Sequence, residues 1–74
     1  MNEYEVVVKF INGCAGEARP QTSFEEIEAA SPEAYLKEKH PVDWSRFTKE
    51  EFDEMVRYTL PIKGATYIYE FTEI

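Results

Sequence analysis

The chain has 74 residues, of which 43% are hydrophobic and 15% aromatic, and its fifteen Asp and Glu residues against eight Lys and Arg residues give a formal net charge of -7. This composition favours one folded domain over residues 1–74, and the negative charge argues against direct binding to nucleic acid phosphates. The longest apolar runs fall far short of the roughly 20 residues needed to cross a bilayer, so we expect no membrane partner.

The first predicted element is a strand over Tyr4 to Ile11, because apolar residues occupy every second position. The other face of this segment is partly apolar as well, which favours a central place in the sheet or coverage on both sides over an exposed edge. Asn12-Gly13 follows at once, and this dipeptide readily adopts the two positive φ angles of a tight hairpin turn. We therefore expect Asn12-Gly13 to join the first strand to the second.

Residues 15–29 allow two interpretations, strand or helix. In one, residues 15–19 pair weakly with the first strand and a helix begins at Ser23 through a capping box. In the other, residues 22–29 form the returning strand after a long loop. We favour the strand, because Ser31-Pro32 is a fresh helix start that follows it almost without a linker.

The first predicted helix begins after Ser31, which is a good N-cap, with Pro32 at the first helical position. The helix runs through Lys39 and ends before Pro41, since the residue before a proline is pushed out of helical geometry. The connector that follows carries Trp44, which we expect to close one end of the core.

A second helix is predicted from the segment after Phe47. Thr48 and Glu51 have the spacing of a capping box, and Phe47 and Phe52 occupy the positions of a hydrophobic staple. Leu60-Pro61 is expected to end this helix.

The last predicted element is a strand over Ala65 to Glu73, which follows a turn at Lys63-Gly64 and alternates aromatic with polar residues. Together the elements predict an α+β fold, in which a small three-stranded antiparallel sheet is covered on one face by two helices.

The sequence holds no recognisable catalytic or metal-binding motif. Cys14 is the single cysteine and His40 the single histidine, and no spacing places the two side by side. A zinc site needs several Cys or His ligands, and no spaced Asp and Asn loop resembles a calcium site. We therefore expect no enzymatic activity, no metal and no cofactor. A lone cysteine and the absence of a leader segment at the start of the sequence favour a cytoplasmic location.

Binding is the function class that remains, and the acidic residues are its candidates. If the second helix forms, Glu50 and Glu54 lie one turn apart, roughly 6 Å from each other and near the spacing of successive nucleic acid phosphates. The competing interpretation is that acids near the start of a helix stabilise it through its dipole. The predicted partner-binding residues are Glu25, Glu26, Glu28, Glu50, Glu51, Asp53 and Glu54.

Two functional hypotheses follow from these observations. The first is a non-enzymatic acidic module that binds a basic surface of another protein, for example a nucleic-acid-binding protein. Its sharpest form is a DNA mimic or an inhibitor of a host defence nuclease, as small acidic proteins of phages and mobile elements often are. The second is a small structural or regulatory domain that forms homodimers or larger homo-oligomers.

Overall fold

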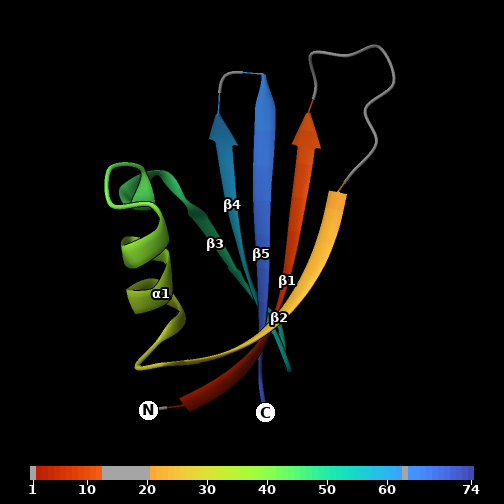
Figure 1. The fold of residues 1–74 in the computed structure, drawn as a ribbon, viewed down its shortest axis with the longest axis vertical. Helices are drawn as coiled ribbons and strands as arrows, with labels where there is room; N and C mark the ends of the chain where they lie inside the picture. The colour runs from red at the N-terminus through yellow and green to blue at the C-terminus, as the bar shows by residue number, and fades with distance from the viewer. Residues whose placement is uncertain (1, 13–20, 63) are drawn as a thin grey trace.

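The computed structural model describes residues 2–12, 21–62 and 64–74 of the chain. These residues form β1 (Asn2–Asn12), β2 (Gln21–Ala29), α1 (Pro32–Lys39), the 3-10 turn η1 (Trp44–Arg46), β3 (Thr48–Glu51), β4 (Val56–Ile62) and β5 (Ala65–Glu73). The strands make one sheet in the order β2-β1-β5-β4-β3, with every neighbouring pair antiparallel. The outer strands are therefore β2 and β3 (Figure 1).

Strand β1 lies between β2 and β5, as its two partly apolar faces predict. Val6 is fully buried on the face that α1 covers, and it lies opposite Phe71 of β5. Val7, on the other face, is only half-buried. The expected central position of the first strand is thus confirmed.

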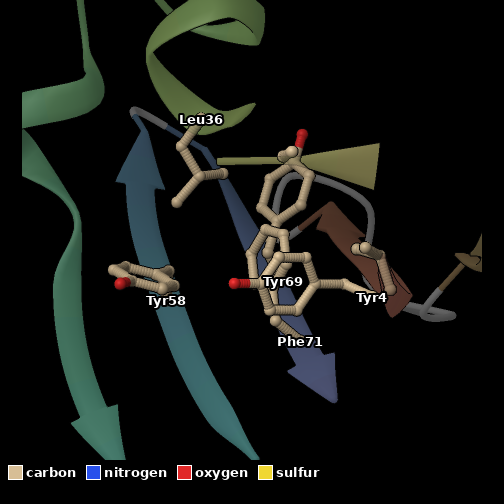
Figure 2. Close-up of a cluster of buried hydrophobic side chains, with 7 residues drawn as sticks. Tyr4, Leu36, Tyr58, Tyr69 and Phe71 are labelled. Atoms are coloured by element: carbon tan, nitrogen blue, oxygen red, sulfur yellow. The ribbon is translucent and has the colours of Figure 1, made fainter. Parts of the chain in front are cut away.

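The core lies between α1 and the inward face of the sheet, and aromatic rings fill most of it (Figure 2). Phe71 is near its centre, with Tyr58, Tyr35 and Tyr4 packed edge-on at centroid distances of 5.8, 5.7 and 6.1 Å. Edge-to-face packing of this kind adds to the hydrophobic gain from burying the rings. The buried members of this cluster are Tyr4, Val6, Ala29, Leu36, Tyr58, Tyr69 and Phe71.

Helix α1 begins and ends where the sequence predicts. The Ser31 hydroxyl accepts a hydrogen bond of 3.1 Å from the backbone N–H of Ala34, which satisfies a donor that the first turn leaves free. At the other end the His40 N–H donates to the Leu36 carbonyl at 2.7 Å. Leu36 has no exposed surface and fixes the helix on the sheet.

The predicted α+β fold, a three-stranded sheet with two helices, is wrong. The described residues form mostly a five-stranded antiparallel sheet with one helix and a 3-10 turn. The error lies in the segment after Phe47, where β3, a turn over residues 52–55 and β4 replace the predicted second helix. The capping-box and staple pattern around Thr48 is a weak local preference. It loses to a strand that buries Tyr58 and Leu60 and pairs with β3 and β5.

Some of the other structural predictions are confirmed and others are wrong. The strand interpretation of residues 22–29 is confirmed by β2, and the last strand by β5. Trp44 lies half-buried in η1 with the Lys37 ammonium 4.5 Å from its ring, so it is not part of the core. The predicted turn at Asn12-Gly13 extends beyond the described residues. Within the described part of the chain, no helix has the length and apolar character to cross a membrane.

Truncation of Leu36 tests the packing of α1 on the sheet. Leu36→Ala should lower the free energy of unfolding by about 2–5 kcal/mol, because it leaves a cavity at a site with no exposed surface. Leu36→Met keeps the volume and should cost less than about 1.5 kcal/mol. Urea unfolding followed by circular dichroism measures both values. Equal losses in the two variants would contradict the packing described above.

Candidate functional site

The sheet face opposite α1 carries charged side chains at its centre. Glu70 of β5 accepts a hydrogen bond of 3.0 Å from Arg57 Nε and forms an ion pair of 2.9 Å with Arg57 Nη2. The Lys9 ammonium lies 3.2 Å from the same carboxylate. Burial raises the pKa of Glu70, but hydrogen bonds and charge from Arg57 and Lys9 outweigh this effect, so the pKa falls below its ordinary value of 4.5. The centre of this face is therefore an electrostatically satisfied cluster.

Four other carboxylates lie on this same face at one end of β1 and β2. In the antiparallel register Glu3 is directly opposite Glu28, and Glu5 is directly opposite Glu26. We call these four residues the paired-glutamate strip. All four side chains are exposed. Directly opposed residues have Cβ atoms roughly 5 Å apart, and alternate residues along a strand are about 7 Å apart. The strip is thus a compact two-by-two array of negative charges.

No cation of the described residues neutralises the strip. The ion pairs of residues 2–12, 21–62 and 64–74 involve other carboxylates, namely Glu33, Asp43, Glu51 and Glu70. Like charges directly opposite one another destabilise a strand pair. The strip therefore differs from the cluster at Glu70, because its charges repel and have no partner within the described chain.

Glu25, a predicted site residue beside the strip, faces the other way. It lies opposite Val6, on the face that α1 covers, and accepts a hydrogen bond of 2.9 Å from the Tyr35 hydroxyl. Burial and this carboxylate together raise the pKa of Tyr35. Glu25 therefore ties α1 to β2, whereas Glu26 and Glu28 point to the open face.

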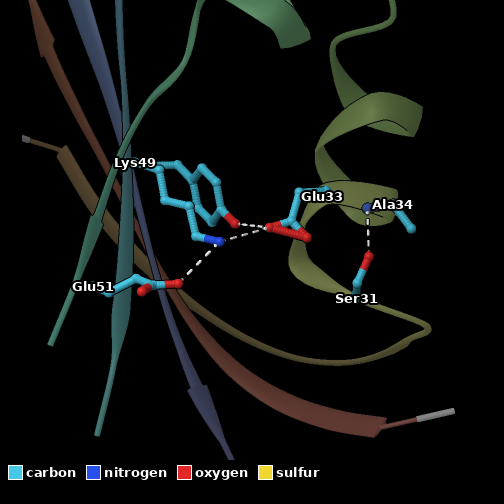
Figure 3. A network of polar contacts seen from close by, with 6 residues as sticks. Ser31, Glu33, Ala34, Lys49 and Glu51 are labelled. Atoms are coloured by element: carbon cyan, nitrogen blue, oxygen red, sulfur yellow. Dashed lines mark hydrogen bonds and ion pairs between the residues drawn. The ribbon is translucent and has the colours of Figure 1, made fainter. Parts of the chain in front are cut away.

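A second acidic group lies near the opposite edge of the sheet, and its two carboxylates share one lysine. The Lys49 ammonium of β3 is 3.1 Å from Glu51 and 3.5 Å from Glu33 of α1 (Figure 3). The Tyr58 hydroxyl also donates a hydrogen bond to Glu33, and this bond is the main reason why the pKa of Glu33 lies below its ordinary value. Burial and the same carboxylate raise the pKa of Tyr58. These contacts join α1 to β3 and β4.

A hollow of about 410 Å³ adjoins this second group. Its wall combines the charged side chains of Glu33, Lys49 and Glu51 with the rings of Phe52 and Tyr58. Lys49 pairs with both of these carboxylates, whereas Glu54 and Glu73, which also line the hollow, form no ion pair with the described residues. The hollow differs from the paired-glutamate strip in having a cation among its carboxylates.

The structure separates the predicted site residues onto two opposite edges of the sheet. Glu25, Glu26 and Glu28 lie on β2, whereas Glu50 and Glu51 lie on β3. Asp53 and Glu54 are exposed in the turn that follows β3, so they do not form one surface with β2. The predicted set is therefore brought together only in part.

The helical row of acids behind the DNA-mimic hypothesis does not exist. Glu50 is in a strand, opposite Arg57, and Glu54 is in a turn, so the two are not one helical turn apart. The hypothesis of a DNA mimic, or of a phage or mobile-element inhibitor, loses its geometric basis and is dropped.

The residues considered for catalysis do not assemble into a site among the described residues. The His40 ring shares a hydrogen bond of 2.7 Å with the Tyr69 hydroxyl and packs against Phe47 and Tyr67, at centroid distances of 5.4 Å to each. Cys14 lies outside the described residues. Within the described ranges, no group of three or more His, Cys, Asp or Glu side chains is arranged to hold a metal ion.

Sequence reasoning missed Glu3 and Glu5 as parts of the site. Glu5 lies in the predicted strand on the face opposite Tyr4 and Val6, and Glu3 precedes that strand by one residue, so the same alternation continued to Glu3 places both on one face. Their pairing with Glu28 and Glu26 depends on the register, which a hairpin pattern at Asn12-Gly13 did not supply. The alternation was thus enough to predict the face of Glu3 and Glu5, but the register was needed to predict their cross-strand partners.

Comparison with known proteins gives no match: no protein-family model, no curated protein and no solved structure resembles this chain closely enough to be assigned. The functional argument therefore rests on the geometry of the paired-glutamate strip.

Reversal of one charge in the strip tests its repulsion. Glu28→Lys should raise the free energy of unfolding by about 0.2–1 kcal/mol, because it places a cation opposite Glu3. Glu50→Lys makes the same change in net charge but places a cation opposite Arg57, so it should be neutral or destabilising. Thermal unfolding at low and high salt measures both, and the gain from Glu28→Lys should shrink as salt rises. Destabilisation by Glu28→Lys would contradict the repulsion.

The cluster at Glu70 predicts a dependence of stability on pH. The lowered pKa of Glu70 means that its carboxylate stabilises the fold above the ordinary value of 4.5, and this contribution is lost as the pH falls through the lowered pKa. Glu70→Gln should therefore be less stable than the wild type near neutral pH and should lose less stability on acidification to about pH 3. Urea unfolding at a series of pH values measures this. Parallel pH profiles for the two proteins would rule the contribution out.

Proposed function

We propose that the protein is a non-enzymatic binding module that recognises a basic surface of another protein. The observation that supports this proposal is the paired-glutamate strip, in which four exposed carboxylates are opposed in pairs without a cation of the described chain beside them. A partner that brings Lys or Arg side chains to this surface removes the repulsion and gains charge complementarity. The net charge of -7 acts in the same direction, because it attracts a basic partner from a distance.

The core supports the same choice of surface. Most large apolar side chains are used in packing between α1 and the sheet. On the open face Val7, Ile11 and Ile68 are half-buried, and Phe24 of the edge strand β2 is exposed. The cluster of Lys9, Glu70 and Arg57 interrupts them. An apolar homodimer through this face, the second functional hypothesis, therefore has less support than recognition through charge. As part of the proposal we place the protein in the cytoplasm, where the single cysteine of the sequence remains reduced.

Two double variants test the proposed surface against the rest of the acidic exterior. Glu26→Gln/Glu28→Gln removes two charges from the strip, and Glu50→Gln/Glu54→Gln removes two from the opposite edge of the sheet. Tagged wild-type protein captures partners from a lysate of the source cells, and each captured protein is identified, purified and titrated against all three chains. We expect a basic partner whose affinity falls steeply between about 50 and 300 mM salt, because screening weakens such contacts.

The two variants should then separate. The strip variant should bind this partner at least about tenfold more weakly, whereas the control variant should keep near wild-type affinity. Equal affinity of all three chains for the partner would remove the strip from the interface. Affinity that does not respond to salt would argue against charge recognition altogether.

A further inference from the structure

The outer edge of β2 offers unpaired backbone groups beside the paired-glutamate strip. This strand has nine residues and lies at the end of the sheet, and no strand of the described residues pairs with its outer side. Alternate N–H and C=O groups of an edge strand point away from the sheet and can form a ladder with an added strand. β3, at the other edge, has only four residues. β2 is therefore the longer template for an added strand.

We infer that β2 accepts an extended basic segment of the partner protein as a sixth strand of the sheet. This inference rests on the proposed function and specifies the partner's conformation and sequence pattern. Backbone hydrogen bonds along the edge supply affinity in this mode of recognition, and the side chains on the two faces supply specificity.

The side chains of β2 define the pattern that fits. Phe24, Glu26 and Glu28 face the open side, and Glu25 and Ile27 face the side of α1. Opposite residues 24–28, a complementary strand therefore presents apolar, basic, basic, apolar and basic side chains in that order. Its alternate residues repeat at about 7 Å, the same interval that separates Glu26 from Glu28 along β2. One added strand thus brings two cations to the strip in register.

Two features on the open side add to the fit. The Phe24 side chain is 70% exposed, with Val7 of β1 as its cross-strand neighbour, and it offers an apolar platform. A hollow of about 190 Å³ opens beside Glu26 and Glu28. Glu3, Ile27 and Ile74 complete its wall, so it gives an acidic and partly apolar space to a Lys or Arg side chain.

A second copy of the chain fits this edge poorly. Two β2 strands in full antiparallel overlap place Glu25 opposite Glu25, and each copy adds a net charge of -7. Like charges in direct cross-strand opposition destabilise the pairing. The acids of β2 thus act against self-association and in favour of a basic strand.

Synthetic peptides test the backbone ladder separately from the charge. The probe has the core Lys-Val-Lys-Lys-Phe, which is the complementary pattern read antiparallel to β2, flanked by threonines to the nine residues of that strand. Two further peptides have the same side chains but methylated backbone nitrogens at alternate residues. One peptide is methylated along one edge of its extended backbone, and the other peptide along the opposite edge. Titration calorimetry gives their affinities for the full chain, and amide hydrogen exchange reports which backbone groups become protected.

We expect the unmodified peptide and one methylated peptide to bind with protection of β2 amides, and the other methylated peptide to bind at least about tenfold more weakly because it cannot form the ladder. Glu26→Gln/Glu28→Gln should weaken binding of the unmodified peptide, whereas Glu50→Gln/Glu54→Gln should not. Equal binding of all three peptides would overturn the added strand and leave charge recognition standing. Failure of all three peptides to bind at about 50 mM salt would also contradict the binding of an added strand. The proposed function has a separate test, which is the titration of the captured partner.

Discussion

The register between β1 and β2 is the constraint on which the rest of the molecule depends. Tyr4 lies opposite Ile27 in this register, which puts both side chains against the aromatic core under α1. A shift of one residue would turn the buried set of β1 to the other face, so the core holds the register firmly. The same register necessarily opposes Glu3 to Glu28 on the open face. The packing of the core on one face of the sheet thus determines which charged residues are cross-strand neighbours on the other face.

The core dictates where these four side chains lie, but it does not dictate that they are acidic. A lysine at position 28 would leave every core contact in place, since residue 28 is exposed on the face away from α1. Repulsion in the two opposed pairs costs about 0.2–1 kcal/mol for each pair. The expected free energy of unfolding of this chain is only several kcal/mol, at about 0.05–0.15 kcal/mol per residue, so this cost is appreciable. Since the fold does not require this cost, binding is the reason that we propose for keeping the four carboxylates.

The sequence was informative wherever one local pattern had a single interpretation. Alternating apolar residues identified β1 and β5, and Ser31-Pro32 located the start of α1, because a proline after an N-cap has few other uses. The segment after Phe47 carried two patterns at once. Its capping-box spacing favoured a helix, while the alternation of Val56, Tyr58 and Leu60 favoured a strand. Pairing with β5 decided between them, and pairing partners are not visible in local sequence.

The candidate site was predictable to the same limited extent. That Glu26 and Glu28 are exposed follows from the strand pattern, but Glu25, next to them in sequence, is bound by the Tyr35 hydroxyl on the opposite face. Composition counts these carboxylates as equal, although Glu25 ties a helix to the sheet, whereas Glu26 and Glu28 form no ion pair with the described residues. The face of the sheet and the strand register decide which carboxylate stabilises the fold and which is accessible to a partner. The net charge of -7 predicts neither of them.

The two edges of the sheet differ in a way that follows from these contacts. At β3 Lys49 pairs with Glu51 and with Glu33 of α1, and the strand has only four residues, so this edge offers little backbone to a partner. At β2, Glu26 and Glu28 have no ion pair within the described part of the chain, and the strand has nine residues. Exposed edges usually carry charge to prevent pairing with further strands. Charge of a single sign, however, prevents pairing only with strands of that sign. The glutamates of β2 therefore disfavour pairing between two copies of this strand, and in the interface that we propose they favour a basic strand.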